Sequence, residues 1–317
     1  MSTAQTTVEP RNPAISFTER TRCALCDSPE RTIYRAFRDI PVVRCSRCGF
    51  LYSSRIMSED TMHAYYRDNF GSLRHMQGQV VNARTNGVAV RKLIDLKNVR
   101  SWLDVGAGYG FLLKWLKDNW SIRAEGVEIS SQEADHARND LGLKISSNMK
   151  DLPRESFDVV SSFEVIEHVA EPKPFVHELA KYVRPGGYLV VMTDNFESVA
   201  AHKLQGGFQK WIPHTHISHF GPATLRDCVN SVDGLKLENE ASYTPWDVVG
   251  RQLVSTFRPP VADEQAYDVR DALSTEMQRN YKLYRLRYLL NPVWAGIDFH
   301  RTMEGGALMY AVCRKQS

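Results

Sequence analysis

Four of the six cysteines form two Cys-x-x-Cys pairs, Cys23 with Cys26 and Cys45 with Cys48, and eighteen residues separate the pairs. This spacing is typical of two knuckles that present four thiolates to one tetrahedral Zn²⁺, each sulfur about 2.3 Å from the ion. Gly49 follows the second pair, where such a knuckle usually makes a left-handed turn. Because sulfur fills all four positions, we predict structural rather than catalytic zinc. The alternative is four buried cysteines without a metal.

Three of the ten histidines, His214, His216 and His219, lie in the stretch WIPHTHISHF, residues 211–220. In an extended segment a His-x-His pair faces one side, and a third histidine could complete a metal triad. An imidazole is also suited to take a proton at neutral pH, because its ordinary pKa is about 6.5. The stretch alone therefore allows a metal site, a general base or a structural loop.

A glycine-rich turn follows a short apolar run at residues 103–110, LDVGAGYG. Asp104 ends the run, and Gly106, Gly108 and Gly110 let the backbone approach a ligand before a helix begins. Glu128 closes the next run eighteen residues after Gly110, where a nucleoside-binding fold places the acid that holds the ribose hydroxyls. The spacing G-x-G-x-G differs from the G-x-G-x-x-G of a pyrophosphate site, and this favours a ligand without phosphate.

Short apolar runs alternate with amphipathic segments from Val99 onward, which predicts a parallel sheet with helices on both faces. One such amphipathic helix is expected over Phe111–Asn119, between the first two strands. The expected strands are Ser101–Val105, Ala124–Glu128, Leu143–Ser146, Phe157–Ser162, Gly187–Thr193, Leu235–Ser242 and Ala307–Arg314.

Four motifs in this order resemble the class I S-adenosylmethionine-dependent methyltransferases: LDVGAGYG, then GVE ending at Glu128, then FDVV and FEVIEHV after Phe157, then RPGGYL from Arg184. The resemblance covers roughly Val99 to Glu240 and the final strand. It implies an α/β fold with a seven-stranded, Rossmann-like sheet whose last strand is antiparallel, so that Ala307–Arg314 inserts beside Leu235–Ser242.

The resemblance also assigns cofactor contacts residue by residue. Asp104 and the glycine loop would face the methionine part, and Glu128 would accept hydrogen bonds from the ribose. Asn148 stands where the family most often has an Asp that accepts from the adenine amino group, and the alternative is a plain turn residue. The full expected set is Asp104, Gly106, Ala107, Gly108, Gly110, Glu128, Ile129, Asn148, Met149 and Phe163.

The motif FEVIEHV places Glu164, Glu167 and His168 at the carboxyl edge of the sheet, where ligands of such folds bind. It is similar to the corresponding motif of ubiquinone-pathway O-methyltransferases, in which acidic residues and histidine can hold a divalent cation. A metal site, a catalytic base and structural support remain open here. The stretch HISHFGPATL also has a family counterpart, and that match selects His216 as a candidate base. Glu164, His168 and His216 are therefore the catalytic candidates.

The chain divides into a disordered tail (1–19), a zinc ribbon (20–55), a helical connector that could cover the cofactor (56–98), the methyltransferase core (99–245 and 305–317) and a helical insert (246–304). Tyr65 and Tyr66 of the connector could reach the cofactor or could pack between ribbon and core. In the insert, Tyr281, Tyr284 and Tyr288 recur at helical spacing with Lys282, Arg285 and Arg287 between them. This pattern predicts packing or a substrate lid that recognises an acidic acceptor.

Composition sets the remaining limits. The 317 residues are 43% hydrophobic with a net charge of +3, which suits a soluble globular protein and gives little support to a nucleic-acid role. No run of eighteen apolar residues occurs and the first twenty residues lack the apolar centre of a signal peptide, so we expect a cytoplasmic protein without a membrane span.

We therefore predict transfer of a methyl group from S-adenosylmethionine to a small-molecule or glycan acceptor, with O-methylation favoured. The order of ribbon and core also resembles sugar C-methyltransferases, which usually have a longer carboxyl-terminal domain. An RNA methyltransferase that docks through the ribbon is the other alternative. Against it, the motif after the fourth strand is SFEV rather than Asn/Asp-Pro-Pro-aromatic, and no Pro-Cys dipeptide is present.

Overall fold

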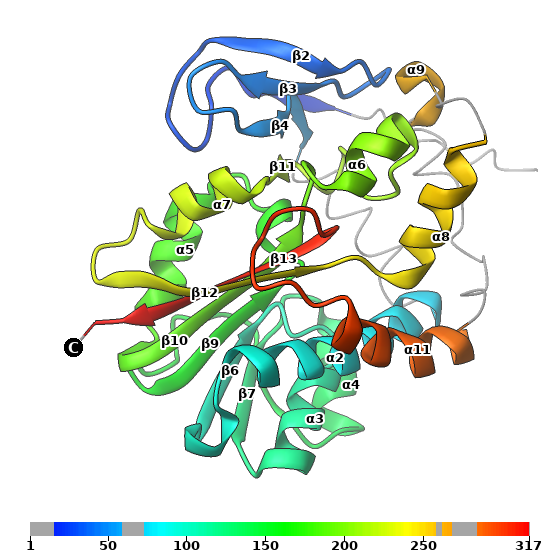
Figure 1. Cartoon of the computed structure of the whole chain (residues 1–317). Coiled ribbons are helices and arrows are strands. Elements are labelled where there is room, and N and C mark those ends of the chain that lie inside the picture. Colours follow the sequence, from blue (N-terminus) through cyan, green and yellow to red (C-terminus); the bar gives the residue numbers. More distant parts are fainter. Residues whose placement is uncertain (1–15, 59–72, 258–261, 268–283, 317) are drawn as a thin grey trace, which may run out of the picture.

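The structure is a computed structural model of the chain and describes residues 16–58, 73–257, 262–267 and 284–316. Its centre is a seven-stranded sheet with the order β12-β13-β10-β9-β6-β7-β8 (Figure 1). The strands are β6 (Ser101–Val105), β7 (Arg123–Val127), β8 (Lys144–Ser146), β9 (Phe157–Phe163), β10 (Val183–Asp194), β12 (Leu235–Tyr243) and β13 (Leu308–Lys315). All seven predicted strands are present, with ends that differ from the prediction by a few residues at most.

Strand β13 is antiparallel to both of its neighbours, β10 and β12. The remaining pairs in the sheet, β6 with β7, β7 with β8, β6 with β9 and β9 with β10, are parallel. The predicted seven-stranded methyltransferase sheet, with its last strand inserted antiparallel, is therefore confirmed. Because the parallel strands all end at one edge, the polar residues that follow them meet there.

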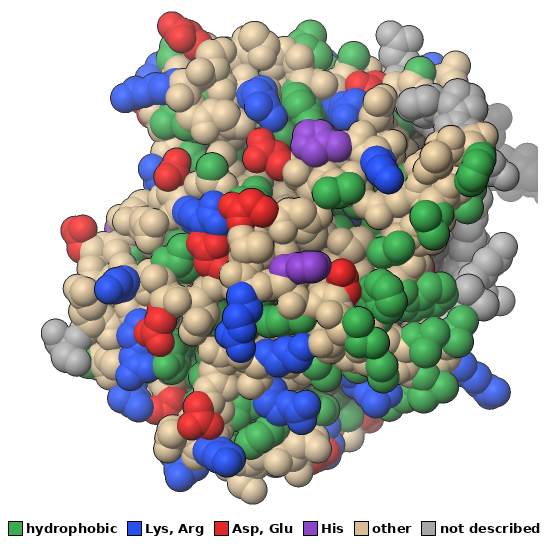
Figure 2. Space-filling model, viewed as in Figure 1, with side chains coloured by type: hydrophobic (Ala, Val, Ile, Leu, Met, Phe, Trp, Pro, Cys, Tyr) green, Lys and Arg blue, Asp and Glu red, His purple; other side chains and the backbone are tan. Residues whose placement is uncertain are grey.

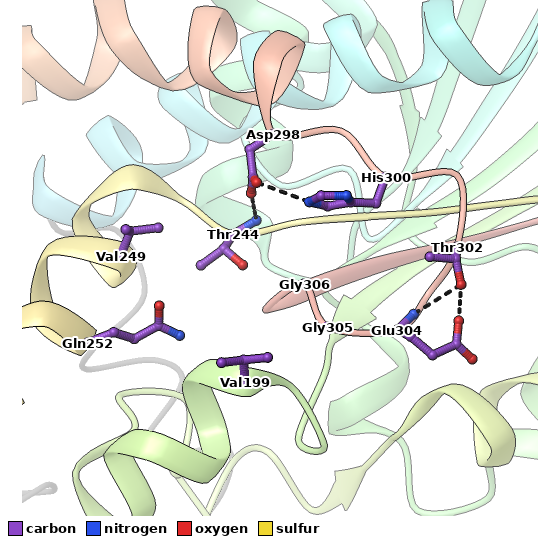
Figure 3. Close-up of a pocket in the computed structure, with 10 residues that line it drawn as sticks. All are labelled: Val199, Thr244, Val249, Gln252, Asp298, His300, Thr302, Glu304, Gly305 and Gly306. Atoms are coloured by element: carbon purple, nitrogen blue, oxygen red, sulfur yellow. Dashed lines mark hydrogen bonds and ion pairs between the residues drawn. The ribbon is translucent and has the colours of Figure 1, made fainter. Parts of the chain in front are cut away.

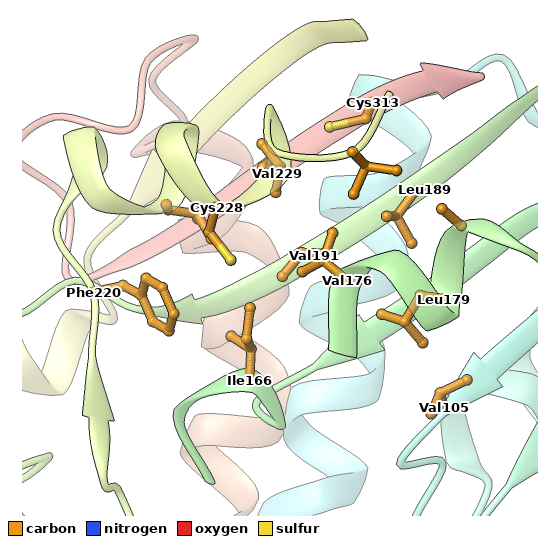
Figure 4. Packing of buried hydrophobic residues seen from close by; sticks show 14 of the residues in the cluster. Val105, Ile166, Val176, Leu179, Leu189, Val191, Phe220, Cys228, Val229 and Cys313 are labelled. Carbon is orange, nitrogen blue, oxygen red and sulfur yellow. The ribbon is translucent and has the colours of Figure 1, made fainter. Parts of the chain in front are cut away.

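Alternate residues of the central strands face two separate hydrophobic cores. Leu189 and Val191 of β10 lie in the core that α5 (Pro172–Ala180) and α7 (Pro222–Val229) cover. Figure 4 shows how Val176 and Leu179 of α5 meet Val191 and Val229 in this core. Val190 and Met192 lie in the opposite core, under α2 (Leu73–Leu93), α3 (Phe111–Trp120), α4 (Ser131–Asn139) and α11 (Tyr284–Ile297).

The amino-terminal segment forms two small sheets beside the large one. Strands β2 (Arg31–Arg35), β3 (Val42–Cys45) and β4 (Leu51–Ser53) are antiparallel, and β1 (Phe17–Glu19) pairs with β5 (Arg55–Met57). The predicted ribbon around the four cysteines is thus present. Its sheet has one further strand, β11 (Ser218–His219), which comes from the histidine-rich stretch and pairs with β4.

Aromatic packing joins the ribbon to the large sheet. Phe50 and Tyr52 of the ribbon lie in the same buried core as Val191, and the rings of Phe50 and Phe220 are 5.0 Å apart. Phe37 packs on Trp211 in a third buried cluster. The ribbon is therefore an integral part of the hydrophobic core and is not held only by a linker.

The insert between β12 and β13 contributes α8 (Trp246–Ser255), α9 (Asp263–Ala266) and α11. Tyr288 receives the guanidinium of Arg84 from α2 over its ring at 4.1 Å, and Arg287 pairs with Asp247 of α8. The aromatic stripe therefore packs against α2 where it is described. Tyr65, Tyr66, Tyr281 and Lys282 lie outside the described residues.

The surface carries charges of both signs. In Figure 2 they alternate over the visible face, whereas hydrophobic side chains gather over α8 and α11. The large exposed apolar residues of these two helices are Leu253, Val254, Leu286, Leu289, Leu290, Val293 and Ile297. None of the helices among the described residues combines the length and the apolar character that crossing a membrane requires.

Asp158, at the start of β9, ties three neighbouring segments together. Its carboxylate accepts hydrogen bonds from the backbone N–H groups of Arg100 and Ser101, from the Ser101 hydroxyl, and from Arg184 of β10. Burial opposes ionisation, but Arg184 and these donors hold the pKa of Asp158 below its ordinary value.

We predict that Asp158→Asn lowers the free energy of unfolding at pH 7 by about 2 kcal/mol, because charge-assisted hydrogen bonds are lost. A depressed pKa stabilises the fold above the ordinary carboxyl pKa, so the difference from wild type should disappear as the pH falls below about 4. Urea unfolding at several pH values measures this. Asp118→Asn, which removes an exposed pair with Lys114, is the control and should have little effect.

Candidate active site

The four cysteines of the ribbon converge as the spacing predicts. The Sγ atoms of Cys23 and Cys48 are 3.5 Å apart, as are those of Cys26 and Cys45, and all four lie within 4.8 Å of one another. Four sulfurs about 2.3 Å from a central ion would be about 3.8 Å apart, so the set fits a closed tetrahedral site. Burial raises the pKa of Cys23 to about 11, and a bound cation would supply the charge that stabilises its thiolate.

Both knuckles turn through a residue with positive φ directly after the second cysteine. Gly49, with φ of 77°, follows Cys48, and Asp27, with φ of 59°, follows Cys26. The sequence predicted the turn at Gly49 from its glycine, whereas the turn at Asp27 was overlooked. Aspartate is one of the few residues other than glycine that tolerate this conformation, and Arg22 pairs with its carboxylate at 2.6 Å.

The glycine loop connects β6 to α3. Gly106, Gly108 and Gly110 all have positive φ, which side chains disfavour. A Cβ at Gly110 would also lie 2.5 Å from Leu143, so the close approach of α3 to this segment requires glycine. The loop residue Ala107 is buried between these glycines, and its N–H donates to the carbonyl of Val127.

Asp104 is buried beneath the loop and held by a short chain of hydrogen bonds. The indole N–H of Trp102 donates to the hydroxyl of Ser161, which in turn donates to Asp104 at 2.6 Å. Burial raises the pKa of Asp104 to about 7, although the Ser161 hydroxyl opposes this, and the nearby charge of Glu128 raises it further. This arrangement fixes the Asp104 carboxyl at the end of β6.

Glu128 lies directly after β7 and joins that strand to the loop. One carboxylate oxygen accepts from the N–H of Gly108 at 2.8 Å, and the other accepts from the N–H of Ser130 at 2.7 Å. Each oxygen keeps a second lone pair, which could accept a ribose hydroxyl. The next residue, Ile129, is 86% exposed and offers an apolar surface beside this carboxylate.

The other expected cofactor residues follow neighbouring strands. Asn148, after β8, is exposed, and its side-chain oxygen accepts from the N–H of Lys150 at 2.9 Å. This is the turn geometry that the alternative interpretation predicted, and the adenine contact stays a prediction. Met149 is partly buried, and Phe163 at the end of β9 has its ring 6.3 Å from Tyr310.

Helix α2 contributes two side chains that sequence reasoning missed. The Gln79 oxygen accepts from the N–H of Tyr109 at 2.9 Å, and a Cβ at Gly108 would lie 2.2 Å from that same oxygen. Asn82, one turn later, donates to Glu164 at 2.6 Å. The sequence predicted that the connector could cover the cofactor, but the many polar residues of α2 gave no signal that singles out Gln79 and Asn82.

Two histidines meet after β9 and β10. His168 lies in a short 3₁₀ turn, and its ring is perpendicular to that of His216 with 4.8 Å between the centroids. The Nδ1 atom of His168 donates to the carbonyl of Thr215 at 2.9 Å, which leaves Nε2 as an acceptor. Glu167, His168 and His216 each offer a ligand atom within 4.8 Å of the others. His216 therefore completes a donor set in which sequence reasoning had placed Glu164.

Two buried carboxyl groups border the histidines. Glu167 is fully buried and accepts from the Thr193 hydroxyl at 2.7 Å, and burial, with the charges of Asp194 and Glu164, raises its pKa to about 8. Asp194 ends β10, and its Oδ2 lies 3.5 Å from Nδ1 of His216. Burial raises the pKa of Asp194 to about 6, and Lys210 opposes this rise.

Lys210 balances the negative charge of the histidine cluster. This cluster consists of two imidazoles and three carboxyl groups, those of His168, His216, Glu164, Glu167 and Asp194. Its ammonium lies 2.8 Å from Glu164 and 3.0 Å from Asp194. Burial alone would raise the pKa of Glu164, but the charge of Lys210 outweighs it and lowers the pKa. Sequence reasoning missed both Asp194 and Lys210. A carboxylate that directly follows the apolar run of β10 was the available signal for the first, whereas no pattern marked the second.

His214 and His219 occupy other surroundings. The ring of His219 packs against those of Phe196 at 4.5 Å and Trp211 at 5.1 Å, and His214 stacks on Tyr267. Burial lowers the pKa of both imidazoles to about 3. Among the described residues, the donor groups close enough to share an ion include His216 but neither of these two. The three histidines of the stretch do not form a metal triad.

A pocket of about 320 Å³ lies where β12 ends and β13 begins, outside the candidate active site (Figure 3). Several of its polar groups bond with one another: Asp298 accepts from the backbone N–H of Thr244 and contacts His300, and the Thr302 hydroxyl donates to Glu304. In the sheet order, β10 and β9 lie between β13, which borders this pocket, and β6, which leads into the glycine loop. It does not include the histidine cluster.

The sulfur geometry predicts one zinc ion per chain. Elemental analysis of protein purified without chelators should find close to one equivalent, and Cys45→Ser should lose it and lower the melting temperature. Cys228→Ala removes a thiol from the core of the large sheet and should retain the metal. Zinc retained at full stoichiometry by Cys45→Ser would contradict the prediction.

The position of Glu128 predicts its role in cofactor binding. Glu128→Ala should weaken the binding of S-adenosylmethionine by about tenfold to a hundredfold, because two charge-assisted hydrogen bonds to the ribose are lost. Calorimetric titration measures this. Glu125→Gln lies on the same strand, where the native carboxylate bonds with Lys144, and should leave the affinity unchanged.

Comparisons with known proteins agree with these motifs. A family model described as a methyltransferase domain matches residues 74–237. The ubiquinone biosynthesis O-methyltransferase of Idiomarina loihiensis is 30% identical over 158 residues, which are 44% of this chain and 62% of that protein. A probable chloroplastic tocopherol O-methyltransferase of Oryza sativa is 30% identical over 107 residues, 31% of this chain and 30% of that protein.

Among solved structures, a SAM-dependent methyltransferase of Thermotoga maritima aligns with a TM-score of 0.47 at 18% sequence identity. The alignment covers 81% of this chain and 94% of that protein. This chain thus spans less than two thirds of the length of the two relatives named above. The family match itself covers more than half of the chain and contains the glycine loop, Glu128 and the motif after β9. The chain therefore belongs to the methyltransferase-domain family.

Proposed function

We propose that the protein transfers a methyl group from S-adenosylmethionine to an oxygen atom of a small-molecule or glycan acceptor, with His216 as the general base. The observation that carries this proposal is the placement of His216 beside Asp194 and His168 at the carboxyl edge of the sheet. Methyl transfer from a sulfonium is an in-line displacement, so the acceptor oxygen must be aligned with the methyl group and must lose its proton.

The histidine cluster is close to the expected cofactor site. Strand β9 lies between β6, which leads into the glycine loop, and β10, which ends at Asp194. The segment after β9 also contacts the loop, since a Cβ at Gly106 would lie 2.3 Å from Val165. An acceptor bound over β9 and β10 would therefore lie next to a cofactor held by the loop and Glu128.

Burial keeps the imidazole of His216 neutral but also weakens it as a base, so proton transfer depends on a carboxylate that stabilises the imidazolium. Burial lowers the pKa of His216 well below the ordinary value, with further contributions from His168 and Lys210, so the imidazole is neutral at pH 7 and can accept a proton. In this mechanism the acceptor hydroxyl gives its proton to one ring nitrogen, and the Asp194 carboxylate next to Nδ1 stabilises the imidazolium. S-adenosylmethionine, when bound, supplies the methyl group.

His168 is the second candidate for the same role. Its hydrogen bond to Thr215 fixes the tautomer in which Nε2 is free to accept a proton. Among the described residues no carboxylate forms an ion pair with His168 as Asp194 does with His216, and we therefore assign His168 to orienting the acceptor and the His216 ring. Glu164, whose two oxygens bond with Lys210 and Asn82, serves to hold Lys210 in place.

A specific observation supports a second form of this function. Glu167, His168 and His216 together are two imidazoles and a carboxylate, a donor set that suits a divalent cation. A cation held there would bind an acceptor oxygen and favour its ionised form, so that no protein base would be needed. Chelator-treated enzyme distinguishes the two forms: loss of turnover that Mg²⁺ or Mn²⁺ restores would support the cation.

The comparisons favour oxygen as the atom that is methylated, because the named curated relatives are O-methyltransferases of small molecules. An RNA acceptor has less support, since the visible face carries charges of both signs (Figure 2). The acceptor can be identified by incubating the enzyme with S-adenosylmethionine and a cell extract, and by searching by mass spectrometry for products heavier by one methylene. Products found only among RNA fragments would overturn the assignment.

With the acceptor so identified, His216→Ala should lower kcat by about a hundredfold to ten-thousandfold, the usual contribution of a general base. Asp194→Asn should lower it less, because the base itself remains. Neither change should alter the affinity for S-adenosylmethionine, which calorimetry checks. His300→Ala, which removes an exposed histidine of the pocket between β12 and β13, is the matched control. Unchanged turnover in His216→Ala would exclude it as the base.

A further inference from the structure

The segment that carries His216 is built into the ribbon sheet. Ser218 and His219 pair with Tyr52 and Leu51 of β4, so the catalytic candidate lies two residues from the fourth strand of the ribbon. The pairing gives a regular backbone connection to residues 205–217, which otherwise contain only a 3₁₀ turn and short turns.

Ser53, the last residue of β4, fastens the segment on both sides of His216. Its N–H donates to the carbonyl of Ile217 at 3.0 Å, directly after the histidine. Its hydroxyl donates to the carbonyl of Pro213 at 2.7 Å, three residues before the histidine. Ser53 is fully buried, so water does not compete with these bonds.

Arg20, the first residue of the ribbon segment, adds a second connection. One guanidinium nitrogen donates to the carbonyl of Ile217 at 2.7 Å, and another donates to the carbonyl of Ala170 at 2.9 Å. The segment is in turn bonded to the residues after β9: the N–H of Ile217 donates to the carbonyl of Glu167 at 2.8 Å, and the Ser218 hydroxyl to that of Val169. The ribbon therefore holds both parts of the histidine cluster in one hydrogen-bonded unit.

A zinc ion held by the four cysteines would cross-link this support. The ribbon is a small unit of short strands, which cannot bury enough apolar surface to be stable alone, and a structural metal would supply the missing free energy. Cys45 ends β3, and Ser53 ends the strand paired with it, so the cross-link and the fastening point belong to the same hairpin.

We propose that Ser53 is a positioning residue for His216, through which the cysteine-bearing ribbon forms the outer wall of the acceptor site. The proposal rests on the proposed function in one respect, the assignment of His216 as the base. It assigns the ribbon a role in methyl transfer itself and not in docking a macromolecule. Ser53 acts through the backbone of the segment: it donates to the carbonyls of Pro213 and Ile217, and its hydroxyl also lies 3.5 Å from the carbonyl of His216.

The first test needs no acceptor. Full-length, zinc-loaded protein labelled with ¹⁵N-histidine gives ring resonances, and those of His216 are identified by their absence in His216→Ala. Ser53→Ala should shift the His216 resonances, while Ser53→Thr, which keeps the hydroxyl, should restore them close to wild type. Ser54→Ala, a neighbouring buried serine whose N–H bonds within the ribbon to Pro41, is the control and should not shift them.

The second test is a double-mutant cycle on turnover, measured as transfer of a labelled methyl group to the extract fraction that supports activity. Ser53→Ala alone should lower kcat about tenfold, which corresponds to about 1.4 kcal/mol, with the affinity for S-adenosylmethionine and the zinc content unchanged. In the His216→Ala background the same change should have less than a twofold effect, because its target is gone.

The outcomes separate the two proposals. Unshifted His216 resonances in Ser53→Ala, or equal effects of Ser53→Ala in both backgrounds, would overturn the positioning role. Loss of zinc or of cofactor affinity in Ser53→Ala would also overturn it, because the effect would then be on folding. If His216→Ala keeps full turnover while Ser53→Ala shifts the His216 resonances, the base assignment fails and the positioning of His216 by Ser53 stands.

Discussion

The contact of Lys210 with Glu164 and Asp194 is the constraint on which the polar edge of the sheet depends. Three acidic side chains and two imidazoles are brought together with little access to water, and such a cluster is costly unless a cation balances it. Lys210 comes from the segment that also carries His216, whereas Glu164 follows β9 and Asp194 ends β10. One ammonium group therefore fixes three chain segments around the place where an acceptor would bind.

Within this cluster the two histidines have different partners. His168 is tied to the backbone of the His216 segment, and His216 faces the carboxylate of Asp194. Their edge-to-face contact means that movement of one ring changes the environment of the other. Ionisation of either imidazole would raise the positive charge beside Lys210, and burial already favours the neutral forms.

The sequence predicted the sheet, the four-cysteine cluster and the glycine loop because each is specified locally. Strand ends such as Asp104 and Glu128 are marked by a polar residue after an apolar run, and Cys-x-x-Cys spacing directly encodes a knuckle. Lys210 and Ser53 were not predicted, because their importance arises from contacts between segments far apart in the chain. Asp194 was overlooked, although a polar residue after the apolar run of β10 marks it in the same way as Asp104 and Glu128. The pairing of β11 with β4 joins residues that are separated by most of the methyltransferase core, and no periodicity records it.

The position of β13 has a consequence for how the protein is made. This strand lies between β10 and β12 and supplies the antiparallel partner to both, yet it is synthesised after the whole insert. Until it is available, β10 and β12 have open edges, and open strand edges promote association with other chains. Biogenesis of the fold is therefore most vulnerable during the synthesis of residues 246–307, when the sheet is nearly complete but cannot yet close.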